Sequence, residues 1–226
     1  MCTFNTDEIY LSWRKSVGKG RFIVGKLFKE NDNYLFEYSS DEILKKAIFE
    51  GFDNYPAFPE LSTTYDKDVL NTFARRLPNP TRKDYEAFLN YWCAKEYKDN
   101  PFAVLGLTGA RLQTDNFEFI APHYEVPASF YTEVAGLHYT DESLLTELKA
   151  TAIYEDITLK AEPENKYDSN AVKVMYKDQS LGYIKIIHSD CVAKALRDNL
   201  KTSAKIKNII KNGSIKEILI EVRISR

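Results

Sequence analysis

The stretch that decides the C-terminal fold is EPENKYDSNAVKV, residues 162–174. Its first part is polar and rich in turn-forming residues, and its end has the apolar character of a strand. A second strand pattern follows at Ser180-Leu181-Gly182-Tyr183-Ile184, where a glycine precedes an aromatic residue. We therefore expect a polar loop between two strands, with asparagine, tyrosine and aspartate side chains crowded together.

This loop has two interpretations. In the first, its Asn and Asp side chains bond their own backbone in a β-turn, Tyr167 packs on the sheet, and Gly182 marks a bulge. In the second, the loop forms a pocket in which a nucleobase stacks on Tyr139 and Tyr167. The Asp168 carboxylate repels phosphate, but it can accept a hydrogen bond from a terminal hydroxyl.

In the pocket interpretation, Asn165 reads a base edge, and Lys185 with the basic C-terminal elements takes the phosphates. Residues 185–226 carry ten Lys or Arg against four acidic residues, a net charge of about +6, whereas the whole chain has −2. An anionic partner would therefore meet this end first. Solvated lysines on ordinary surface elements explain the same bias.

Outward from the loop, a period of two predicts a β-rich C-terminal half. The expected strands cover residues 130–139, 156–161, 171–176, 181–186, 204–210 and 215–224. One helix, residues 190–200, interrupts them. Short strands with one helix predict a compact, partly closed OB-like β-barrel. Pro122 and Pro127 flank the expected boundary, which gives domains 1–126 and 127–226.

The N-terminal half predicts a small antiparallel sheet plus helices, so the fold class is α+β. Strand-like alternation covers residues 9–13, 21–27, 34–38 and 116–120. Apolar residues spaced by three and four predict helices over residues 66–77 and 81–95. A further short helix is expected over residues 101–107, closed by Gly109.

The motifs of common catalytic and cofactor sites are missing. The sequence has no GxxxxGK[ST] loop, no GxGxxG opening a helix, no GxSxG elbow and no HExxH pattern. We therefore expect no cofactor, no metal and no catalysis, although an enzyme with another constellation stays a third hypothesis. The apolar runs are too short for a bilayer, and three scattered cysteines favour a reducing compartment, so we expect a cytoplasmic location without membrane contact.

The C-terminal part resembles a HIRAN domain, a family found in bacterial proteins and at the N-terminus of eukaryotic SNF2-type helicases. The resemblance rests on VAGLHY at residues 134–139, on the stretch 162–174, on LGYI at 181–184 and on the helix that follows. The central pattern, E-P-x-N-x-Y-D-x-N-A-[IV]-x-V, is fairly specific.

This resemblance implies an OB-like barrel that holds the 3′ end of single-stranded DNA, as the helicase examples do. By position, Tyr139 and Tyr167 flank the terminal base. Asp168 meets the 3′-hydroxyl, and Asn165 supports the base.

The sequence departs from the helicase pattern at three positions. His138 stands where that pattern has Arg, and Tyr183 stands where it has His. Ile186 replaces a backbone-binding Lys, with Lys185 adjacent. The predicted DNA-binding residues are therefore His138, Tyr139, Asn165, Tyr167, Asp168, Tyr183 and Lys185.

Residues 1–126 resemble the N-terminal subdomain of HipA-type kinases. The matching segments are VGKL at 24–27, FEY at 36–38, FPEL at 58–61, FARRL at 73–77, DNPF at 99–102 and LTGAR at 107–111. The kinase core itself has no place in the chain. The resemblance implies a noncatalytic scaffold that contacts a partner protein, and the alternative is a small α+β domain that only packs on the barrel.

Two binding functions follow. The first is a module for a DNA 3′ end joined to a noncatalytic interaction domain. The second is a protein-interaction or regulatory component of a toxin–antitoxin-like or defence system whose barrel binds no nucleic acid, and the substituted positions 138 and 183 motivate it. Binding to free against blocked 3′ ends separates the two.

Overall fold

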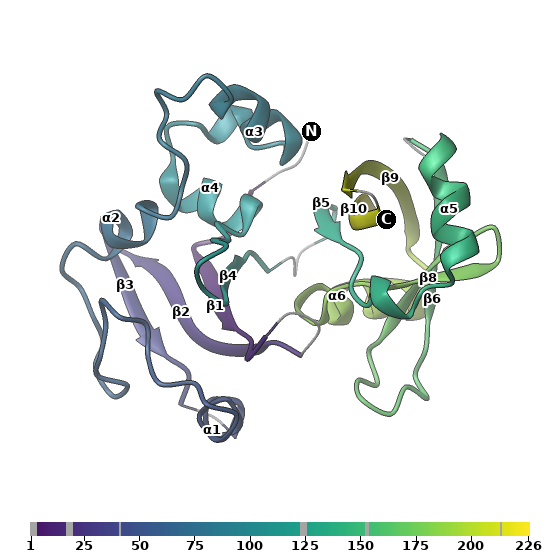
Figure 1. Cartoon of the computed structure of the whole chain (residues 1–226). Helices are drawn as coiled ribbons and strands as arrows, with labels where there is room; N and C mark the ends of the chain where they lie inside the picture. Colours follow the sequence, from purple (N-terminus) through teal and green to yellow (C-terminus); the bar gives the residue numbers. More distant parts are fainter. Residues whose placement is uncertain (1–3, 17–19, 41, 123–125, 152–153, 213) are drawn as a thin grey trace. The chain divides into compact units, whose positions relative to one another are not determined.

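The computed structural model describes residues 4–16, 20–40, 42–122, 126–151, 154–212 and 214–226 (Figure 1). The chain divides into two compact units. We call Phe4–Pro122 the N-terminal unit and the described residues after Pro122 the C-terminal unit. The predicted boundary between 126 and 127 lies close to this division.

The N-terminal unit holds a four-stranded antiparallel sheet of order β3-β2-β1-β4. Its strands are β1 (Glu8–Trp13), β2 (Phe22–Glu30), β3 (Asn33–Tyr38) and β4 (Phe117–Ile120). Its helices are α1 (Glu42–Phe49), α2 (Val69–Ala74), α3 (Tyr85–Tyr91), the 3-10 turn η1 (Lys95–Tyr97) and α4 (Pro101–Thr108). The small antiparallel sheet with helices that the sequence predicts is therefore confirmed.

Helix α4 begins and ends where its sequence signals predict. Pro101 occupies the first turn, where a missing N–H costs nothing, and the Asn100 side chain accepts a hydrogen bond from Ala103 N at 3.2 Å. Gly109 adopts φ 74° at the C-terminus, a conformation that L side chains disfavour.

The two other predicted helices of this unit are shorter than expected. Helix α2 starts only after Asp68, whose φ of 52° is left-handed. The predicted helix 81–95 is reduced to α3, because the Thr81 hydroxyl donates to Asn79 Oδ1 at 2.9 Å and does not cap a helix. Helix α3 ends near Cys93, whose φ is 56°. Spacing alone did not reveal these local side-chain and backbone preferences.

Aromatic side chains form much of the N-terminal core. Phe36 and Phe73 are fully buried, with ring centroids 5.1 Å apart in an edge-to-face arrangement. Tyr38 is buried beside them; its hydroxyl donates to Phe58 O at 2.6 Å and accepts from Tyr55 N at 2.7 Å. Burial raises the pKa of Tyr38 to about 12, so it stays neutral in the core.

The C-terminal unit holds a six-stranded antiparallel sheet of order β5-β10-β9-β6-β7-β8. The strands are β5 (Ala128–Glu133), β6 (Asp156–Ala161), β7 (Val172–Tyr176), β8 (Gln179–Tyr183), β9 (Lys201–Asn212) and β10 (Ser214–Ser225). An isolated bridge between Ala135 and Tyr183 links the segment after β5 to β8, the opposite edge strand. Within the described residues no continuous ladder joins the two edges, so the predicted barrel is an open sheet with bridged edges.

The prediction of one helix in this half is wrong, because its described residues form two α-helices. Helix α6 (Ile186–Arg197) starts four positions before the expected 190. Helix α5 (Glu142–Thr151) was not predicted at all. Its signal is present in the sequence: Asp141 caps the Ser143 N–H at 2.8 Å, and Leu144 and Leu148, four residues apart, are both buried.

The predicted strand 130–139 is correct only in its first half. The chain leaves β5 after Glu133, and Gly136 adopts φ 83°, which an extended strand does not allow. Residues Leu137–Tyr139 form the 3-10 turn η2. The VAGLHY segment is thus a turn, and its side chains do not alternate across a sheet.

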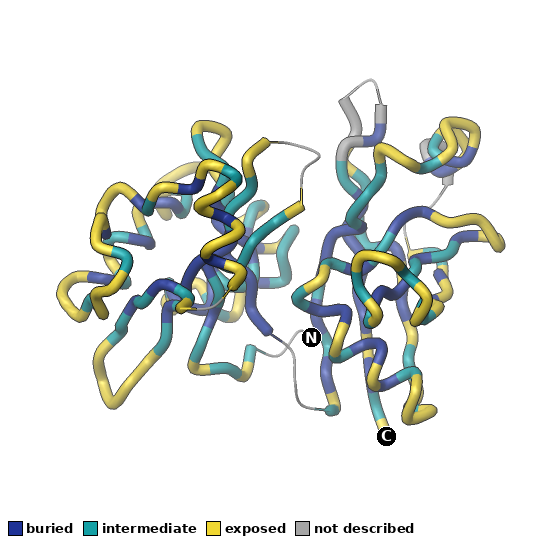
Figure 2. Tube along the Cα trace, turned by 90° about the horizontal axis from the view of Figure 1, so that it is seen from below, coloured by how far each residue is buried: buried dark blue, intermediate teal, exposed yellow. Residues whose placement is uncertain are grey.

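Strands β6 and β7 alternate buried residues with more exposed ones, whereas all four residues of β4 are buried (Figure 2). In the C-terminal unit, buried aliphatic residues of the sheet, such as Val172, Ile206 and Ile220, pack with apolar residues of α5 and α6 into one core. Among the described residues, no helix has both the length and the apolar character that a membrane span requires.

Candidate nucleic-acid interface

Turn η2 is anchored on strand β8 by a close backbone contact. The Ala135 and Tyr183 backbones exchange hydrogen bonds of 2.8 and 2.9 Å. Gly182 makes this possible, because a Cβ there would overlap the carbonyl oxygen of Ala135, and its φ of 134° suits glycine. The Thr140 hydroxyl also donates to Leu181 O at 2.8 Å. The segment that carries His138 and Tyr139 is therefore held at the end of β8.

The loop between β6 and β7 is shaped by the Asn165 side chain. Its Oδ1 accepts from the Tyr167 and Asp168 backbone N–H groups at 3.0 and 3.2 Å. Its Nδ2 donates to Glu162 Oε2 at 2.7 Å. Asn165 thus forms the turn, as the β-turn interpretation predicts, and its second Nδ2 hydrogen remains for a base edge.

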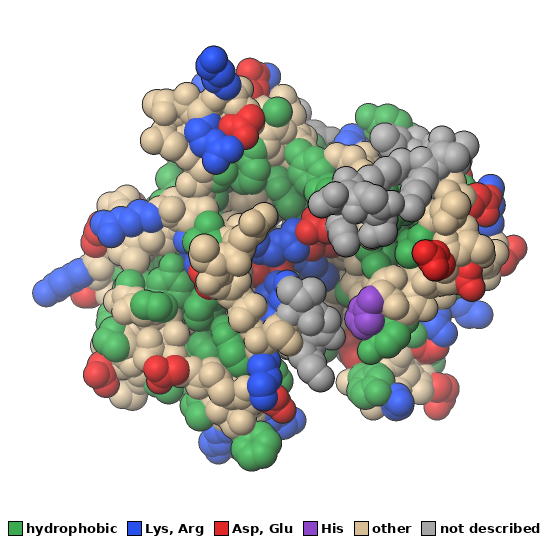
Figure 3. All heavy atoms as spheres, viewed as in Figure 1, with side chains coloured by type: hydrophobic (Ala, Val, Ile, Leu, Met, Phe, Trp, Pro, Cys, Tyr) green, Lys and Arg blue, Asp and Glu red, His purple; other side chains and the backbone are tan. Residues whose placement is uncertain are grey.

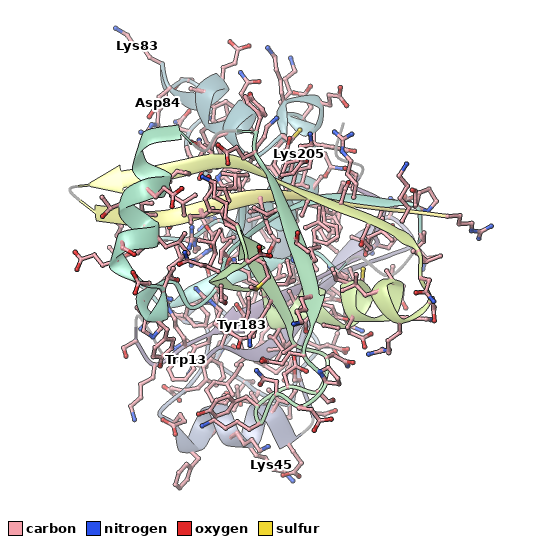
Figure 4. The ribbon with its side chains drawn as sticks, turned by 90° about the vertical axis from the view of Figure 1, so that its right-hand side faces the viewer. Trp13, Lys45, Lys83, Asp84, Tyr183 and Lys205 are labelled. Atoms are coloured by element: carbon pink, nitrogen blue, oxygen red, sulfur yellow. The ribbon has the colours of Figure 1, made fainter. Side chains whose placement is uncertain are left out.

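Glu162 connects this loop to the sheet. Its carboxylate pairs with Lys173 on β7 and accepts from the Tyr183 hydroxyl on β8 at 2.9 Å. Hydrogen bonds from Lys173, Asn165 and Tyr183 lower the pKa of Glu162 to about 2. Because Tyr183 contacts both Ala135 and Glu162, the η2 segment and the loop lie at the same end of the sheet (Figure 4).

The Asp168 carboxylate links the loop to helix α6. Its Oδ1 accepts from Asn170 N at 2.8 Å, and its Oδ2 accepts from the buried Ser189 hydroxyl at 2.9 Å. The Asn170 side chain adds bonds to Asp190 and Arg197 on the same helix. Each Asp168 oxygen has a second lone pair, so the carboxylate can still accept a bond from a ligand.

Two tyrosine rings of this region face solvent. Tyr139 is 85% exposed and Tyr167 is 83% exposed, so neither ring belongs to a core. The ring centroids of His138 and Tyr139 are 3.8 Å apart. The Lys166 ammonium lies 4.7 Å from the Tyr167 ring centroid. Exposed rings on hydrogen-bonded segments suit the stacking of a planar ligand.

Most of the predicted DNA-binding residues therefore lie at this end of the sheet. Lys185 differs from them, because it forms an ion pair inside the unit. Lys185 pairs with Glu133 at 3.0 Å, and its side chain is only 18% exposed. Its charge is compensated inside the unit, which weakens its predicted role on phosphate. The cation that sequence reasoning overlooked is Lys166, which is exposed beside Tyr167, and its place inside the 162–174 motif was the available signal.

His188 and Cys191, whose spacing resembles that of metal ligands, lie in a different environment. His188 is buried, its Nδ1 is 3.1 Å from the Thr132 hydroxyl, and its ring packs on Phe130. Burial raises the pKa of the Cys191 thiol to about 11, which disfavours the thiolate that a metal needs. In the described part of the chain, no three His, Cys, Asp or Glu residues are grouped to hold a metal ion.

Comparison with known proteins gives a family for this unit. Residues 127–225 match the model of the HIRAN domain. A crystal structure of a protein from Lactobacillus plantarum is 20% identical, with a TM-score of 0.35, over 41% of this chain and 91% of that chain. The HIRAN domain of human HLTF is 19% identical, with a TM-score of 0.35, over 43% of this chain and 77% of that chain.

No curated protein matches the chain. The predicted resemblance of residues 1–126 to HipA-type kinases stays a prediction. The motif at 162–174 and the family match at 127–225 agree, and the C-terminal unit is therefore a HIRAN domain.

Proposed function

We propose that the C-terminal unit binds the 3′ end of single-stranded DNA on its OB-like sheet, and that the chain acts by binding, without catalysis. The observation that carries this proposal is the pair of exposed rings, Tyr139 and Tyr167, on segments that Tyr183 joins at one end of the sheet. Family membership supports it, because the sequence resembles HIRAN domains that hold such ends.

Stacking is the main source of affinity in this proposal. A base on an aromatic ring contributes about 1–3 kcal/mol and requires no particular sequence. The hydrogen bonds of η2 and of the loop hold both rings before the ligand arrives, so little conformational entropy is lost on binding.

Asp168 selects the chemistry of the end. Its free lone pairs accept a hydrogen bond from a 3′-hydroxyl, whereas a 3′-phosphate would meet like charge. Lys166, exposed beside Tyr167, takes the adjacent phosphate in place of Lys185, whose charge Glu133 compensates.

The test compares otherwise identical oligonucleotides that end in a 3′-hydroxyl or a 3′-phosphate, by fluorescence anisotropy with the full chain. We expect the hydroxyl end to bind at least about tenfold more tightly, a difference of about 1.4 kcal/mol. Asp168→Asn keeps the shape of the side chain and removes its charge, so it should abolish the preference. Equal binding of both ends by the unsubstituted protein would exclude the proposed role of Asp168.

Removing either ring tests stacking directly. Tyr139→Ala and Tyr167→Ala should each weaken binding by about 1–3 kcal/mol. Phe49→Ala is the matched control, because Phe49 is 90% exposed but lies in the N-terminal unit. If all three variants bind equally well, the rings are not a stacking platform.

A second function, contact with a partner protein, is favoured by the surface of α1. Phe49 is 90% exposed there, and Ile43 and Ile48 are 40% and 44% exposed. The adjacent hollow of about 340 Å³ is lined by Phe22, Lys45, Lys46, Phe49 and Glu50. Figure 3 shows hydrophobic side chains beside basic ones at the bottom of the view, where α1 lies in Figure 1.

This second function is tested by affinity purification from native cells. A partner in stoichiometric amount that survives nuclease treatment and is lost with Phe49→Ser would support it. A partner that disappears with nuclease would be held by nucleic acid instead.

A further inference from the structure

A second basic surface lies on strands β9 and β10, away from the loop that carries Tyr167. It is a groove of about 300 Å³, lined by Tyr154, Ser203, Lys205, Lys207, Glu221 and Arg223. Figure 4 shows Lys205 beside the long β9–β10 ribbon, separate from Tyr183.

The strand register brings these side chains to one face. In the strand register, Glu221 of β10 lies opposite Lys205 of β9 and opposite Tyr131 of β5. Arg223 lies opposite Ser203 of β9. The register of β9 against β10 shifts between Leu219 and Ile220, next to the position of Lys207. Such a bulge redirects side chains, and bulges are frequent beside binding sites.

Tyr154 is held in this groove in an uncommon backbone conformation. Its φ is 72°, in the left-handed region that costs a residue with a side chain about 1 kcal/mol or more. Its N–H donates to Ile206 O at 2.7 Å, and Ile206 N donates to Glu155 O at 3.0 Å. These bonds hold the conformation, and they leave the ring 64% exposed.

Lys207 lies between two tyrosine rings. Its Nζ is 5.2 Å from the Tyr154 ring centroid and 5.5 Å from that of Tyr131. Its two basic neighbours are already paired: Lys205 with Asp156 at 3.2 Å and Arg223 with Glu221 at 2.7 Å. Among the described residues no carboxylate pairs with Lys207. Its ammonium is therefore held in place by rings and keeps its charge available for an anion.

We propose that this groove binds a phosphate and an adjacent base of the same DNA strand, on the 5′ side of the bound 3′ end. The phosphate pairs with Lys207, and the base stacks on the exposed ring of Tyr154. This inference rests on the proposed function and extends it to a second contact. The ring favours a nucleic acid, in which every phosphate is next to a base that can stack, over a run of Asp and Glu side chains, which carry no ring.

The distance between the two contacts suits a strand of several nucleotides. Strand β6 runs from Asp156, which pairs with Lys205 of the groove, to Ala161, the residue before Glu162 of the loop. Its six residues at about 3.3 Å each span roughly 20 Å. OB folds bind about 4–16 nucleotides, so one strand can reach both contacts.

The experiment compares a short and a long oligothymidylate with free 3′ ends, of about 3 and about 12 nucleotides, below and within that range. The full chain is titrated at several salt concentrations. The variants are Lys207→Ala and Tyr154→Ala. Lys194→Ala is the control, because Lys194 is exposed in the same unit on α6 and outside the groove.

We expect Lys207→Ala and Tyr154→Ala to weaken binding of the long oligonucleotide by about fivefold or more, and to leave the short one unchanged. Lys207→Ala should also reduce the slope of log K against log salt by about 0.7, the value for one phosphate on a single strand. Lys194→Ala should change neither quantity.

Equal effects of Lys207→Ala and Lys194→Ala on the long oligonucleotide would contradict DNA binding in the groove. This result would leave the proposed binding of the 3′ end at Tyr139 and Tyr167 unaffected. Loss of long-strand binding with Lys207→Ala, together with indifference to Tyr167→Ala and to a blocked 3′ end, would support the groove and exclude the end site. Binding of an acidic peptide that depends on Lys207, without any binding of oligonucleotides, would overturn both.

Discussion

The Glu162 carboxylate sets the pH range in which the loop keeps its shape. Its pKa falls from 4.5 to about 2, because Lys173, Asn165 and Tyr183 bond the charged form. A pKa that is lower in the folded state adds stability that is present above about pH 4.5 and is lost as the pH falls toward about 2.

In the Glu162→Gln variant, the unfolding free energy should therefore fall less steeply between about pH 5 and pH 2 than in the unsubstituted protein. The two slopes should differ by at most about 1.4 kcal/mol per pH unit. Urea unfolding at stepped pH measures this slope. Glu164→Gln, in the same loop and exposed, is the control and should follow the unsubstituted protein. Parallel slopes for all three proteins would show that Glu162 is not the titrating group.

Gly182 decides how closely η2 approaches β8. Gly182→Ala places a methyl group on the Ala135 carbonyl oxygen and strains a φ of 134°. We expect a loss of more than about 1–3 kcal/mol of stability, the usual cost of local strain, and weaker binding of a 3′ end.

Gly136→Ala is the matched control, because its φ of 83° is also positive but its Cβ would meet only Tyr139 Cδ2, at 3.9 Å. Urea unfolding should rank Gly182→Ala as the more damaging change. The reverse order would show that the close approach at Ala135 is not a constraint.

At the scale of elements, the loop between β6 and β7 depends on helix α6. The Ser189 hydroxyl has one hydrogen, which it shares between Asp168 Oδ2 at 2.9 Å and the Ile186 carbonyl at 2.8 Å, so it links the loop to the first turn of the helix. Without this tie, the Tyr167 ring would sample more positions before binding.

Ser189→Ala should cost about 0.5–1.5 kcal/mol of stability and speed hydrogen exchange of the Tyr167 and Asn170 amides. It should also weaken binding of a free 3′ end. Ser169→Ala, exposed in the loop itself, is the control. Unchanged exchange in the Ser189 variant would mean that other contacts hold the loop.

Elements also differ in how far their sequence predicts them. Helix α4 carries Asn100, Pro101 and Gly109, each of which acts locally, and its prediction is confirmed. The turn η2 follows instead from Gly136 and from a contact with β8, about 45 residues further along the chain. A strand prediction for VAGLHY fails because local spacing does not contain that contact.

At the scale of the whole molecule, each unit buries its own core. The aromatic cluster around Phe36 and Phe73 belongs to the N-terminal unit, and the aliphatic cluster around Val172 and Ile220 belongs to the C-terminal unit. Separate cores are the condition for separate folding.

We therefore expect a fragment of residues 123–226 to unfold in one cooperative transition and to bind a 3′-hydroxyl oligonucleotide as tightly as the full chain does. Circular dichroism with urea and fluorescence anisotropy measure the two properties. A fragment of residues 4–122 should not bind. An unfolded C-terminal fragment would show that its core requires the other unit.

The sequence by itself determined the α+β class, the approximate positions of most strands and the loop at 162–174, because periodicity, turn residues and a specific motif act over short distances. The roles that it predicts for Tyr139, Tyr167 and Asp168 stay predictions. Only the tertiary structure decided that Lys185 is compensated by Glu133 and that Lys207 lies between two rings. The physical reason is that the availability of a charge depends on neighbours from other strands, and strand pairing places those neighbours far away in sequence.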